Sequence, residues 1–381
     1  PDLGPELNRL LATALGGGGG AGADFAVRLQ QTWGPVMAKA VEDTAYYRWH
    51  RLVALNEVGG DPGLLDDASA DGLHAWADHQ QAHWPLGMTT LSTHDTKRSE
   101  DVRARLLALA GDAESWERCS EEFAAAAAER GVDAPTAHLL WQTLAGVGHV
   151  AEERLTGYLT KAMRESKQRT SWLDPDLDYE GKVLDLARAA LRPGVLRALV
   201  DTAVDHNVDG IRTIVLGQKL LQLTVPGVPD TYQGCEVVDL SLVDPDNRRS
   251  VDYDDRRERL AHLSDGGAPR DLDDEKLLVT ASALHLRREL PEDFGDQGGY
   301  EPLQSTSRHL VGFVRGGEVA VLATRAPKRL EAMGGWRTET VTLPEGLWRD
   351  ELTEELHGGG VNDCVGLLAT YPVALLRKVH T

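Results

Sequence analysis

The sequence predicts an α/β protein: part of an α/β barrel followed by a small antiparallel β-sandwich. Helical spacing of apolar residues dominates the first two-thirds of the chain. A few short apolar segments, such as Gly87–Thr93, are typical of buried strands set between helices. After about residue 276, short alternating segments separated by Gly-Gly and Pro turns indicate a β module.

Length and charge narrow the class of protein further. The 381 residues suggest two or three domains and allow a large core without disulfides. With 40 basic and 60 acidic side chains the formal charge is −20, which argues against nucleic acid or an anionic membrane as partner. No run approaches the roughly 18–20 apolar residues of a membrane span. The sequence opens without a secretory signal or an initiator Met, so we expect a processed product or a piece of a longer protein.

Cysteine and histidine usage excludes several kinds of site. The 3 cysteines are far apart and odd in number, which favours a reducing, cytoplasmic compartment and excludes a disulfide scaffold or a Cys-based zinc site. The 13 histidines include no His-x-x-x-His or His-Glu-x-x-His pair, so no metal site is expected. No Gly-x-Ser-x-Gly elbow supports a serine triad.

The elements follow in order from periodicity and turn residues. Asp24 is a plausible N-cap, and the glycine run from residue 16 lacks the Gly-Lys-Ser/Thr ending of a phosphate loop, which makes a flexible surface loop the better interpretation. The predicted helices span 4–15, 24–53, 69–84, 101–165, 184–206, 210–223 and 277–289. The predicted strands span 87–93, 220–224, 309–315, 318–323, 338–343 and 373–378.

The first candidate site is the segment 92–101 (STHDTKRSED), where His94 and Asp95 follow a predicted buried strand. In a barrel, the carboxyl ends of the strands form the active-site face. A carboxylate there could stabilise a cationic transition state or bind sugar hydroxyls. The alternative is that Asp95 is a helix N-cap followed by a solvated charge cluster, and pattern alone leaves both open.

The second candidate is a charged helical segment that begins at Lys39. Helical spacing pairs Lys39 with Asp43 and Thr44 with Arg48 as ordinary surface partners, and without other knowledge this interpretation is preferred. The third candidate, 226–236 (PGVPDTYQGCE), is a Pro/Gly turn that could shape a pocket or simply close a barrel.

Two further segments resemble known motifs but fail on detail. The segment 244–249 (DPDNRR) starts like a calcium loop, but Arg replaces the next ligands and the turn Gly is missing, so a hydrogen-bonded Asp–Arg network is preferred. The segment 209–213 (DGIRT) looks like a barrel strand carrying a nucleophile, but Ile214 stands where the carboxylate is required. We therefore interpret it as the start of a helix.

Together these segments resemble one family, the maltooligosyltrehalose synthases of the α-amylase superfamily (glycoside hydrolase family 13). The matching segments are KAVEDTAYYR (39–48), LNEVGGDP (55–62), TTLSTHDTKRSEDVRARL (89–106), RTSWLDPDLDYE (169–180) and PGVPDTYQGCEVVDLSLVDPDNRRSVDY (226–253). The resemblance runs from about residue 33 to 260, and more weakly through the β module.

The resemblance implies an isomerase, a (1→4)-α-D-glucan 1-α-D-glucosylmutase of trehalose biosynthesis. It converts the reducing-end α-1,4 linkage of a maltooligosaccharide into an α,α-1,1 linkage by retaining, intramolecular transglycosylation without a cofactor. Asp95 then stabilises the transition state, His94 binds hydroxyls in the −1 subsite, and Lys39 and Lys97 hold the reducing-end glucose. The remaining implied pocket members are Arg98, Glu42 and Tyr232.

One departure from the family pattern limits what the chain could do alone. A retaining glycosidase needs a nucleophile and a general acid/base about 5–5.5 Å apart, and the family carries both on earlier strands that have no counterpart here. The resemblance therefore implies the C-terminal half of a (β/α)8 barrel with an inserted helical subdomain, then a C-terminal antiparallel β-sandwich domain. The expected parts are 1–105 (later barrel), 106–175 (helical insertion), 176–290 (end of barrel) and 291–381 (β-sandwich).

We therefore expect a chain that is inactive without an N-terminal fragment of the same enzyme, which would complete the barrel. The expected substrate is a maltooligosaccharide. An α-amylase-type α-1,4-glucan hydrolase and a non-catalytic glucan-binding module remain as alternatives.

Overall fold

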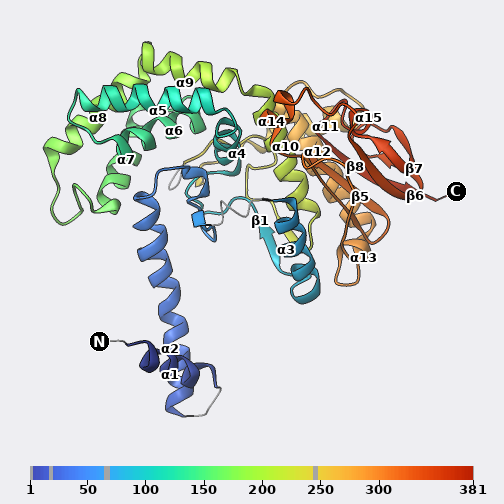
Figure 1. Cartoon of the computed structure of the whole chain (residues 1–381), viewed down its shortest axis with the longest axis horizontal. Helices are drawn as coiled ribbons and strands as arrows, with labels where there is room; N and C mark the ends of the chain where they lie inside the picture. The colour runs from blue at the N-terminus through green and yellow to red at the C-terminus, as the bar shows by residue number, and fades with distance from the viewer. Residues whose placement is uncertain (1–2, 17–19, 64–68, 243–247, 381) are drawn as a thin grey trace.

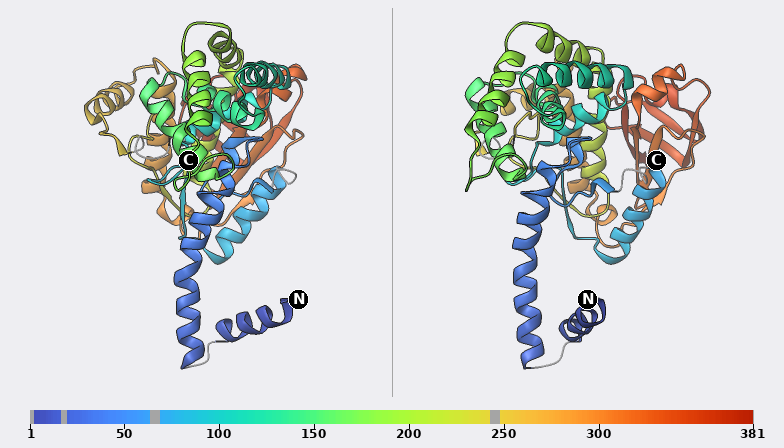
Figure 2. Two further views of the ribbon diagram at one scale, coloured as in Figure 1. Left: turned by 90° about the vertical axis from the view of Figure 1, so that its left-hand side faces the viewer. Right: turned by 60° about the vertical axis from the view of Figure 1, so that its left-hand side comes forward.

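The computed structural model describes residues 3–16, 20–63, 69–242 and 248–380. A group of helices lies at one end of the molecule and a curled antiparallel sheet at the other, with α10 and α12 between them (Figure 1). An arm made of α1 and α2 projects from the body, as Figure 2 shows from two further sides. The α/β class predicted from the sequence is confirmed.

The helices account for most of the first three hundred residues. They are α1 (Gly4–Leu15), α2 (Ala21–Val36), α3 (Ala70–His83), α4 (Glu100–Leu109), α5 (Ala113–Ala128), α6 (Ala134–Val147), α7 (Glu152–Ser166), α8 (Leu177–Leu191), α9 (Val195–Asp205), α10 (Val208–Thr224), α11 (Tyr253–Ser264), α12 (Leu272–Glu289) and α13 (Pro291–Phe294). A π-helical turn η1 (Met37–Glu42) and two 3₁₀ turns, η2 (Ala45–Tyr47) and η3 (Val53–Leu55), follow α2.

Helices α4 to α9 pack around one hydrophobic core. Leu106, Phe123, Leu140 and Leu159 are completely buried in it. Aspartates begin three of these helices: Asp112, Asp133 and Asp176 each accept a backbone N–H of the first turn and so satisfy a donor that has no partner within the helix. The prediction of helices over 101–165 is confirmed, with breaks between α4, α5, α6 and α7.

The β module is a single six-stranded antiparallel sheet in the order β3-β4-β5-β8-β6-β7. Its strands are β3 (Glu301–Pro302), β4 (Leu310–Arg315), β5 (Val319–Thr324), β6 (Thr340–Asp350), β7 (Leu356–Asp363) and β8 (Val373–Val379), with short helices α14 (Pro327–Ala332) and α15 (Cys364–Leu367) between them. A bridge between Ser305 and Val341 joins the β3 side to β6, so the sheet curls on itself.

Both faces of this sheet are covered. Val311, Phe313 and Val321 face a core that includes Leu220 of α10 and other residues of α10 and α12. Leu310, Val314, Leu322 and Trp348 belong to a separate core on the other side. Because apolar residues cover both faces, β4 and β5 are buried at every position.

Two parallel strands form a second, smaller sheet: β1 (Met88–Thr90) and β2 (Val228–Asp230). Strand β1 falls inside the predicted segment 87–93, but its predicted burial is wrong, because Met88 is 75% exposed and β1 pairs with β2 alone in the described chain. Trp84, Leu86 and Val228 are also exposed around it. A parallel strand pair with one bare apolar side is unusual, since parallel sheets are normally covered on both faces.

Three predicted boundaries are wrong for identifiable reasons. The apolar run 220–224 is the end of α10 and lies buried against the sheet, and a short apolar run of this kind does not distinguish a buried helix from a strand. Pro193 and Gly194 split the predicted helix 184–206 into α8 and α9. In place of the predicted helix 24–53, the α-helix α2 ends at Val36. The N-cap of α2 is Gly20, so the prediction that Asp24 is the N-cap is wrong, and Asp24 lies in the first turn of the helix.

The predicted start of a helix near 209–213 is confirmed by α10. The glycine run 16–20 lies partly outside the described residues, as does the segment 244–249 up to residue 247. Each helix that the structure describes is too short or too polar to span a bilayer.

Candidate active site

The two parallel strands bring two predicted segments to one edge. Thr90 and Asp230 are paired at the carboxyl ends of β1 and β2. The turn with Asp95 follows β1, and Tyr232 follows β2, so both leave the same end of the sheet. Polar side chains beyond the carboxyl ends of parallel strands are the usual position of active-site groups in α/β barrels.

The turn that carries His94 and Asp95 is held by the hydroxyl of Thr93. This oxygen accepts the backbone N–H groups of Asp95 and Thr96, each at 3.1 Å. The side chains of His94 and Asp95 are exposed. The interpretation of Asp95 as a helix N-cap is wrong, because α4 begins at Glu100 and its N-cap is Ser99. Asp95 thus projects into solvent from a turn whose backbone is fixed.

Glu57 holds the segment that follows Asp95. Its buried carboxylate accepts the backbone N–H of Lys97 at 2.7 Å and that of Arg98 at 3.1 Å. These two buried backbone N–H groups thereby gain a hydrogen-bond acceptor, which a buried backbone donor requires. Sequence reasoning assigned Glu57 no role, and the signal available was its place in the segment LNEVGGDP, which carried the resemblance.

Lys39 and Lys97, which are far apart in the sequence, meet at one carboxylate. Lys39 Nζ lies 2.5 Å from Asp43 Oδ2, and Lys97 Nζ lies 2.9 Å from Asp43 Oδ1. The predicted pairing of Lys39 with Asp43 is confirmed, but the partner is not a simple surface residue, since Asp43 also binds the buried Lys97. The predicted pairing of Thr44 with Arg48 is wrong, because Arg48 Nε donates to the carbonyl oxygen of Ser166.

Electrostatics connects this cluster to Asp95. The hydrogen bond to Asp43 raises the pKa of Lys39, and the charges of Glu165 and Asp95 add to the effect. Burial acts to raise the pKa of Asp43, but the hydrogen bonds from Lys39 and Lys97 outweigh it and lower the pKa of this carboxyl. The raised pKa of Lys39 and the lowered pKa of Asp43 therefore keep this pair as ammonium and carboxylate at neutral pH.

The other three predicted site residues lie further from this cluster or in the interior. Arg98 is buried; its Nη2 donates to the Tyr158 hydroxyl at 2.6 Å, which gives it a structural contact. Glu42 is half-buried at the end of η1. Tyr232 is half-buried beyond β2, and burial raises the pKa of its hydroxyl. Within the part of the chain that the structure describes, no hydrogen bond or ion pair joins Glu42 to Lys39, Lys97 or Asp95.

A buried group of four charges anchors α4 beneath the turn. Lys276 Nζ lies 2.9 Å from Glu100 Oε1 and 2.6 Å from Asp101 Oδ2, and Lys219 Nζ lies 2.7 Å from Glu100 Oε1. Burial acts to raise the pKa of Glu100, but Lys276 and Lys219 outweigh it and lower the pKa to about 2. We name Glu100, Asp101, Lys219 and Lys276 the buried quartet. It ties the first turn of α4 to α10 and α12, and sequence reasoning did not identify it.

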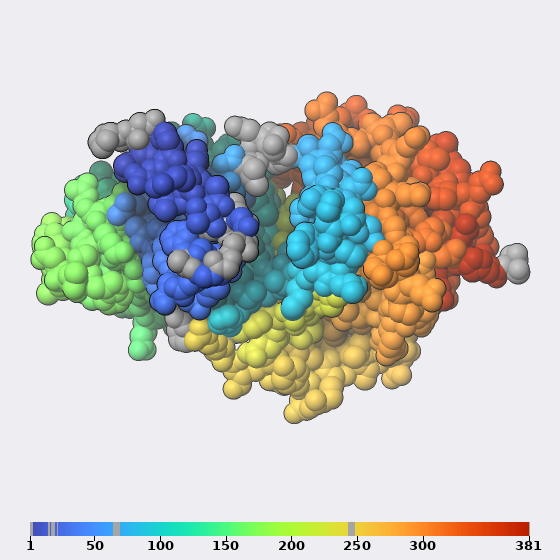
Figure 3. Space-filling view, turned by 90° about the horizontal axis from the view of Figure 1, so that it is seen from below, coloured from blue at the N-terminus to red at the C-terminus, as the bar shows by residue number. Residues whose placement is uncertain are grey.

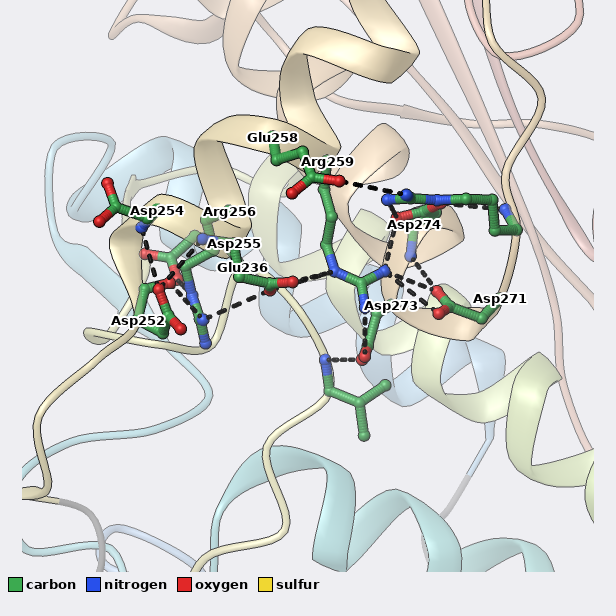
Figure 4. Close-up of polar contacts among 12 residues, drawn as sticks. Glu236, Asp252, Asp254, Asp255, Arg256, Glu258, Arg259, Asp271, Asp273 and Asp274 are labelled. Atoms are coloured by element: carbon green, nitrogen blue, oxygen red, sulfur yellow. Dashed lines mark hydrogen bonds and ion pairs between the residues drawn. The ribbon is translucent and has the colours of Figure 1, made fainter.

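An Asp–Arg network supports the loop that carries Tyr232. Arg259 of α11 binds Asp271 at 2.9 Å and the buried Asp274 at 2.6 Å, as Figure 4 shows. Arg256 Nη2 donates to the carbonyl oxygen of Gly234 at 3.0 Å, and Arg256 also pairs with Glu236. This network is separate from the one predicted for 244–249, which stays a prediction because residues 244–247 lie outside the described part.

The part of the chain that the structure describes contains no group of three His, Cys, Asp or Glu side chains arranged to hold a metal ion. A cavity of about 430 Å³ opens between α6, α7 and α8, and Tyr47, His50 and Asp133 are among the residues that line it. None of the seven predicted site residues lines this cavity. Of the predicted site residues, His94, Asp95 and Lys39 are exposed, whereas Lys97 is buried behind Asp43.

Comparison with known proteins gives the family context. No family model matches the chain. The chain is 42% identical over 391 aligned residues to a putative maltooligosyl trehalose synthase of Mycobacterium tuberculosis, covering 99% of this chain and 48% of that protein. The solved maltooligosyltrehalose synthase of Arthrobacter ramosus superposes with a TM-score of 0.89 at 41% identity, over 100% of this chain and 49% of that one.

A more distant solved structure agrees. The hypothetical maltooligosyl trehalose synthase of Sulfolobus tokodaii has a TM-score of 0.76 at 28% identity and covers 93% of this chain and 47% of its own. The chain spans about half the length of the relatives that it matches. The resemblance to the maltooligosyltrehalose synthases that the motifs predicted is thereby confirmed, across nearly the whole of this chain and about half of theirs.

Proposed function

We propose that this chain is the C-terminal half of a maltooligosyltrehalose synthase and acts on maltooligosaccharides. The observation that carries the proposal is the meeting of Lys39 and Lys97 at Asp43, with Asp95 electrostatically coupled to Lys39 and placed beyond the carboxyl end of a parallel strand pair, in a chain 42% identical to such synthases. The reaction converts the reducing-end α-1,4 linkage into an α,α-1,1 linkage. It is an isomerisation, because the reducing-end glucose, which leaves with its O4 when the C1–O4 bond breaks, is rejoined to the same C1 through its own anomeric oxygen.

Three carboxyl groups share this chemistry. A nucleophile and a general acid/base, supplied by the N-terminal half, form and break the covalent glycosyl intermediate. The general acid protonates O4 as the C1–O4 bond breaks, and as base it later removes the proton from the attacking anomeric hydroxyl. Asp95 contributes a fixed negative charge beside the oxocarbenium-like transition state. His94 binds hydroxyls of the same sugar, with Arg98, Glu42 and Tyr232 as further pocket members.

The lysines give the reaction its acceptor. After the first bond breaks, the free glucose turns over and presents its anomeric hydroxyl in place of water. Ammonium groups donate hydrogen bonds but accept none, so Lys39 and Lys97 can hold sugar oxygens during this step. Retention of this glucose is what separates a synthase from a hydrolase of the same superfamily.

The exposed apolar side chains around the strand pair support the proposal that another polypeptide packs against it. Met88, Leu86, Trp84 and Val228 form an exposed apolar surface around β1 and β2. Figure 3 shows the chain from the side on which the arm and α3 face the viewer. We propose that the N-terminal half of the enzyme covers this surface and completes a (β/α)8 barrel, because parallel strands are stable when covered on both faces.

The proposed parts follow the same division: residues 1–105 and 176–290 are barrel, 106–175 are a helical insertion, and 291–381 form the β-sandwich domain. A core made only of residues between 303 and 376, on one face of the curled sheet, supports the separate C-terminal part.

The test combines this chain with the N-terminal half of the Arthrobacter ramosus synthase and supplies maltopentaose. We expect reducing ends to disappear without release of glucose, and a product with a non-reducing terminus. A rise in reducing ends would instead support the glucan hydrolase. Binding of maltopentaose without turnover would support the glucan-binding module, and turnover by this chain alone would contradict its dependence on a partner.

A further inference from the structure

Asp43 joins two lysines that come from distant parts of the chain. It directly follows η1, which carries Lys39, while Lys97 follows the Asp95 turn. The side chain of Lys39 is 77% exposed, that of Asp43 18% and that of Lys97 5%. The carboxylate thus lies between a lysine in the interior and a lysine at the surface.

We propose that Asp43 is a positioning residue that decides whether the glycosyl intermediate reacts with the retained glucose or with water. It does so by fixing both ammonium groups through its two oxygens. The inference rests on the proposed function and adds to it a determinant of the ratio between transglycosylation and hydrolysis.

The first argument is geometric. A lysine side chain is flexible and loses much conformational entropy when it is held in one place. Because Asp43 uses a different oxygen for each lysine, it fixes the separation of the two ammonium groups as well as their directions. A glucose that must rotate and be recaptured needs both anchors in place at once, since misplacement by about 1 Å can cost on the order of a hundredfold in rate.

The second argument concerns charge. Two ammonium groups near one another repel, and a carboxylate between them removes that repulsion. The hydrogen bond to Asp43 raises the pKa of Lys39, so this group stays charged at neutral pH. An ammonium has three N–H donors, and the one given to Asp43 leaves two on the exposed Lys39 for sugar oxygens.

The third argument is that other contacts fix the backbone at Lys39 and Lys97, so Asp43 is needed only to position their side chains. Glu57 already binds the backbone N–H of Lys97. Thr44 Oγ1 donates to the carbonyl oxygen of Lys39 at 2.8 Å and so closes the end of η1. Loss of the Asp43 charge should therefore free the ammonium groups while the backbone stays in place.

The experiment compares Asp43→Asn with wild type in the chain reconstituted with the N-terminal half. We expect the ratio of trehalose-type product to hydrolysed maltooligosaccharide to fall on the order of tenfold, with the unfolding midpoint changed little. The matched control is Asp178→Asn, because Asp178 forms an i,i+4 pair with Lys182 at the same 2.5 Å distance but is 81% exposed on α8. The control should leave the product ratio unchanged.

The outcomes separate the two proposals. An unchanged product ratio in Asp43→Asn, with wild type making the trehalose-type product, overturns the positioning role alone. Absence of that product from wild type overturns the proposed function. If Asp43→Asn fails to fold, Asp43→Glu keeps the charge but shifts the oxygens, and we expect an intermediate ratio; a wild-type ratio in Asp43→Glu would overturn the inference.

Discussion

The buried carboxylate of Glu57 accepts the backbone N–H of Lys97 at 2.7 Å, across 40 residues of sequence. This hydrogen bond joins the loop after η3 to the loop after β1, and it lies two residues beyond Asp95. The same carboxylate binds the next N–H, of Arg98. Glu57 therefore acts on the proposed site without facing it, by fixing the backbone that carries Asp95 and Lys97.

Replacing Glu57 by Ala should lower the free energy of unfolding by about 2–3 kcal/mol, because two buried N–H groups lose their acceptor. Denaturant unfolding of the chain measures this. Glu57→Gln keeps one side-chain oxygen as an acceptor, so we expect a smaller loss. Equal losses in the two variants would contradict a role through hydrogen bonds to the backbone.

Replacing Lys276 by Met should destabilise the protein by about 3–5 kcal/mol, because Asp101 loses its ammonium partner inside the protein. The variant Lys182→Met removes a lysine of an exposed pair and should change stability by less than about 0.5 kcal/mol. Thermal unfolding of both variants beside wild type provides the measurement. A Lys276 variant as stable as wild type would show that the buried quartet does not hold α4 in place.

Replacing Asp95 by Asn should reduce turnover of the reconstituted enzyme by about a thousandfold, since one fixed charge at the transition state is lost. Stability should change little, because the side chain is exposed. Initial rates with maltopentaose, together with the unfolding midpoint, test both statements. Near-normal turnover would remove Asp95 from the catalytic groups.

The Asp–Arg network should make stability depend on acid pH. The hydrogen bond from Arg270 holds the pKa of Asp274 far below its usual range, against the opposing effect of burial. A lowered folded-state pKa gives stability that is fully present above the unfolded value of about 3.9 and is lost progressively as the pH falls from there through the folded-state pKa. The unfolding midpoint of Asp274→Asn should therefore lie well below wild type at pH 6, and the gap should be smaller at pH 3 and close only when the pH falls through the lowered folded-state pKa. An equal gap at both pH values would contradict this linkage.

The sequence by itself determined the fold class, the family resemblance and most element positions. Local patterns were enough for α3, α10 and the strands β4, β5 and β8, because helix periodicity, caps and turn residues act within a few positions. The same patterns misassigned 220–224, since an apolar run buried on all sides gives no period to distinguish helix from strand. The irregular β7, rich in glycine, gave no signal and was missed.

Tertiary structure alone decided how the site is assembled. The sharing of Asp43 by Lys39 and Lys97, the binding of the Lys97 backbone by Glu57 and the buried quartet all join residues that are far apart in the chain. Such contacts depend on which faces of the helices and strands pack together. Burial of the whole hydrophobic core decides this packing, and no local sequence pattern shows it. The sequence therefore supplied the charged groups, and only the packing of α4, α10 and the strand pair determined which of them meet.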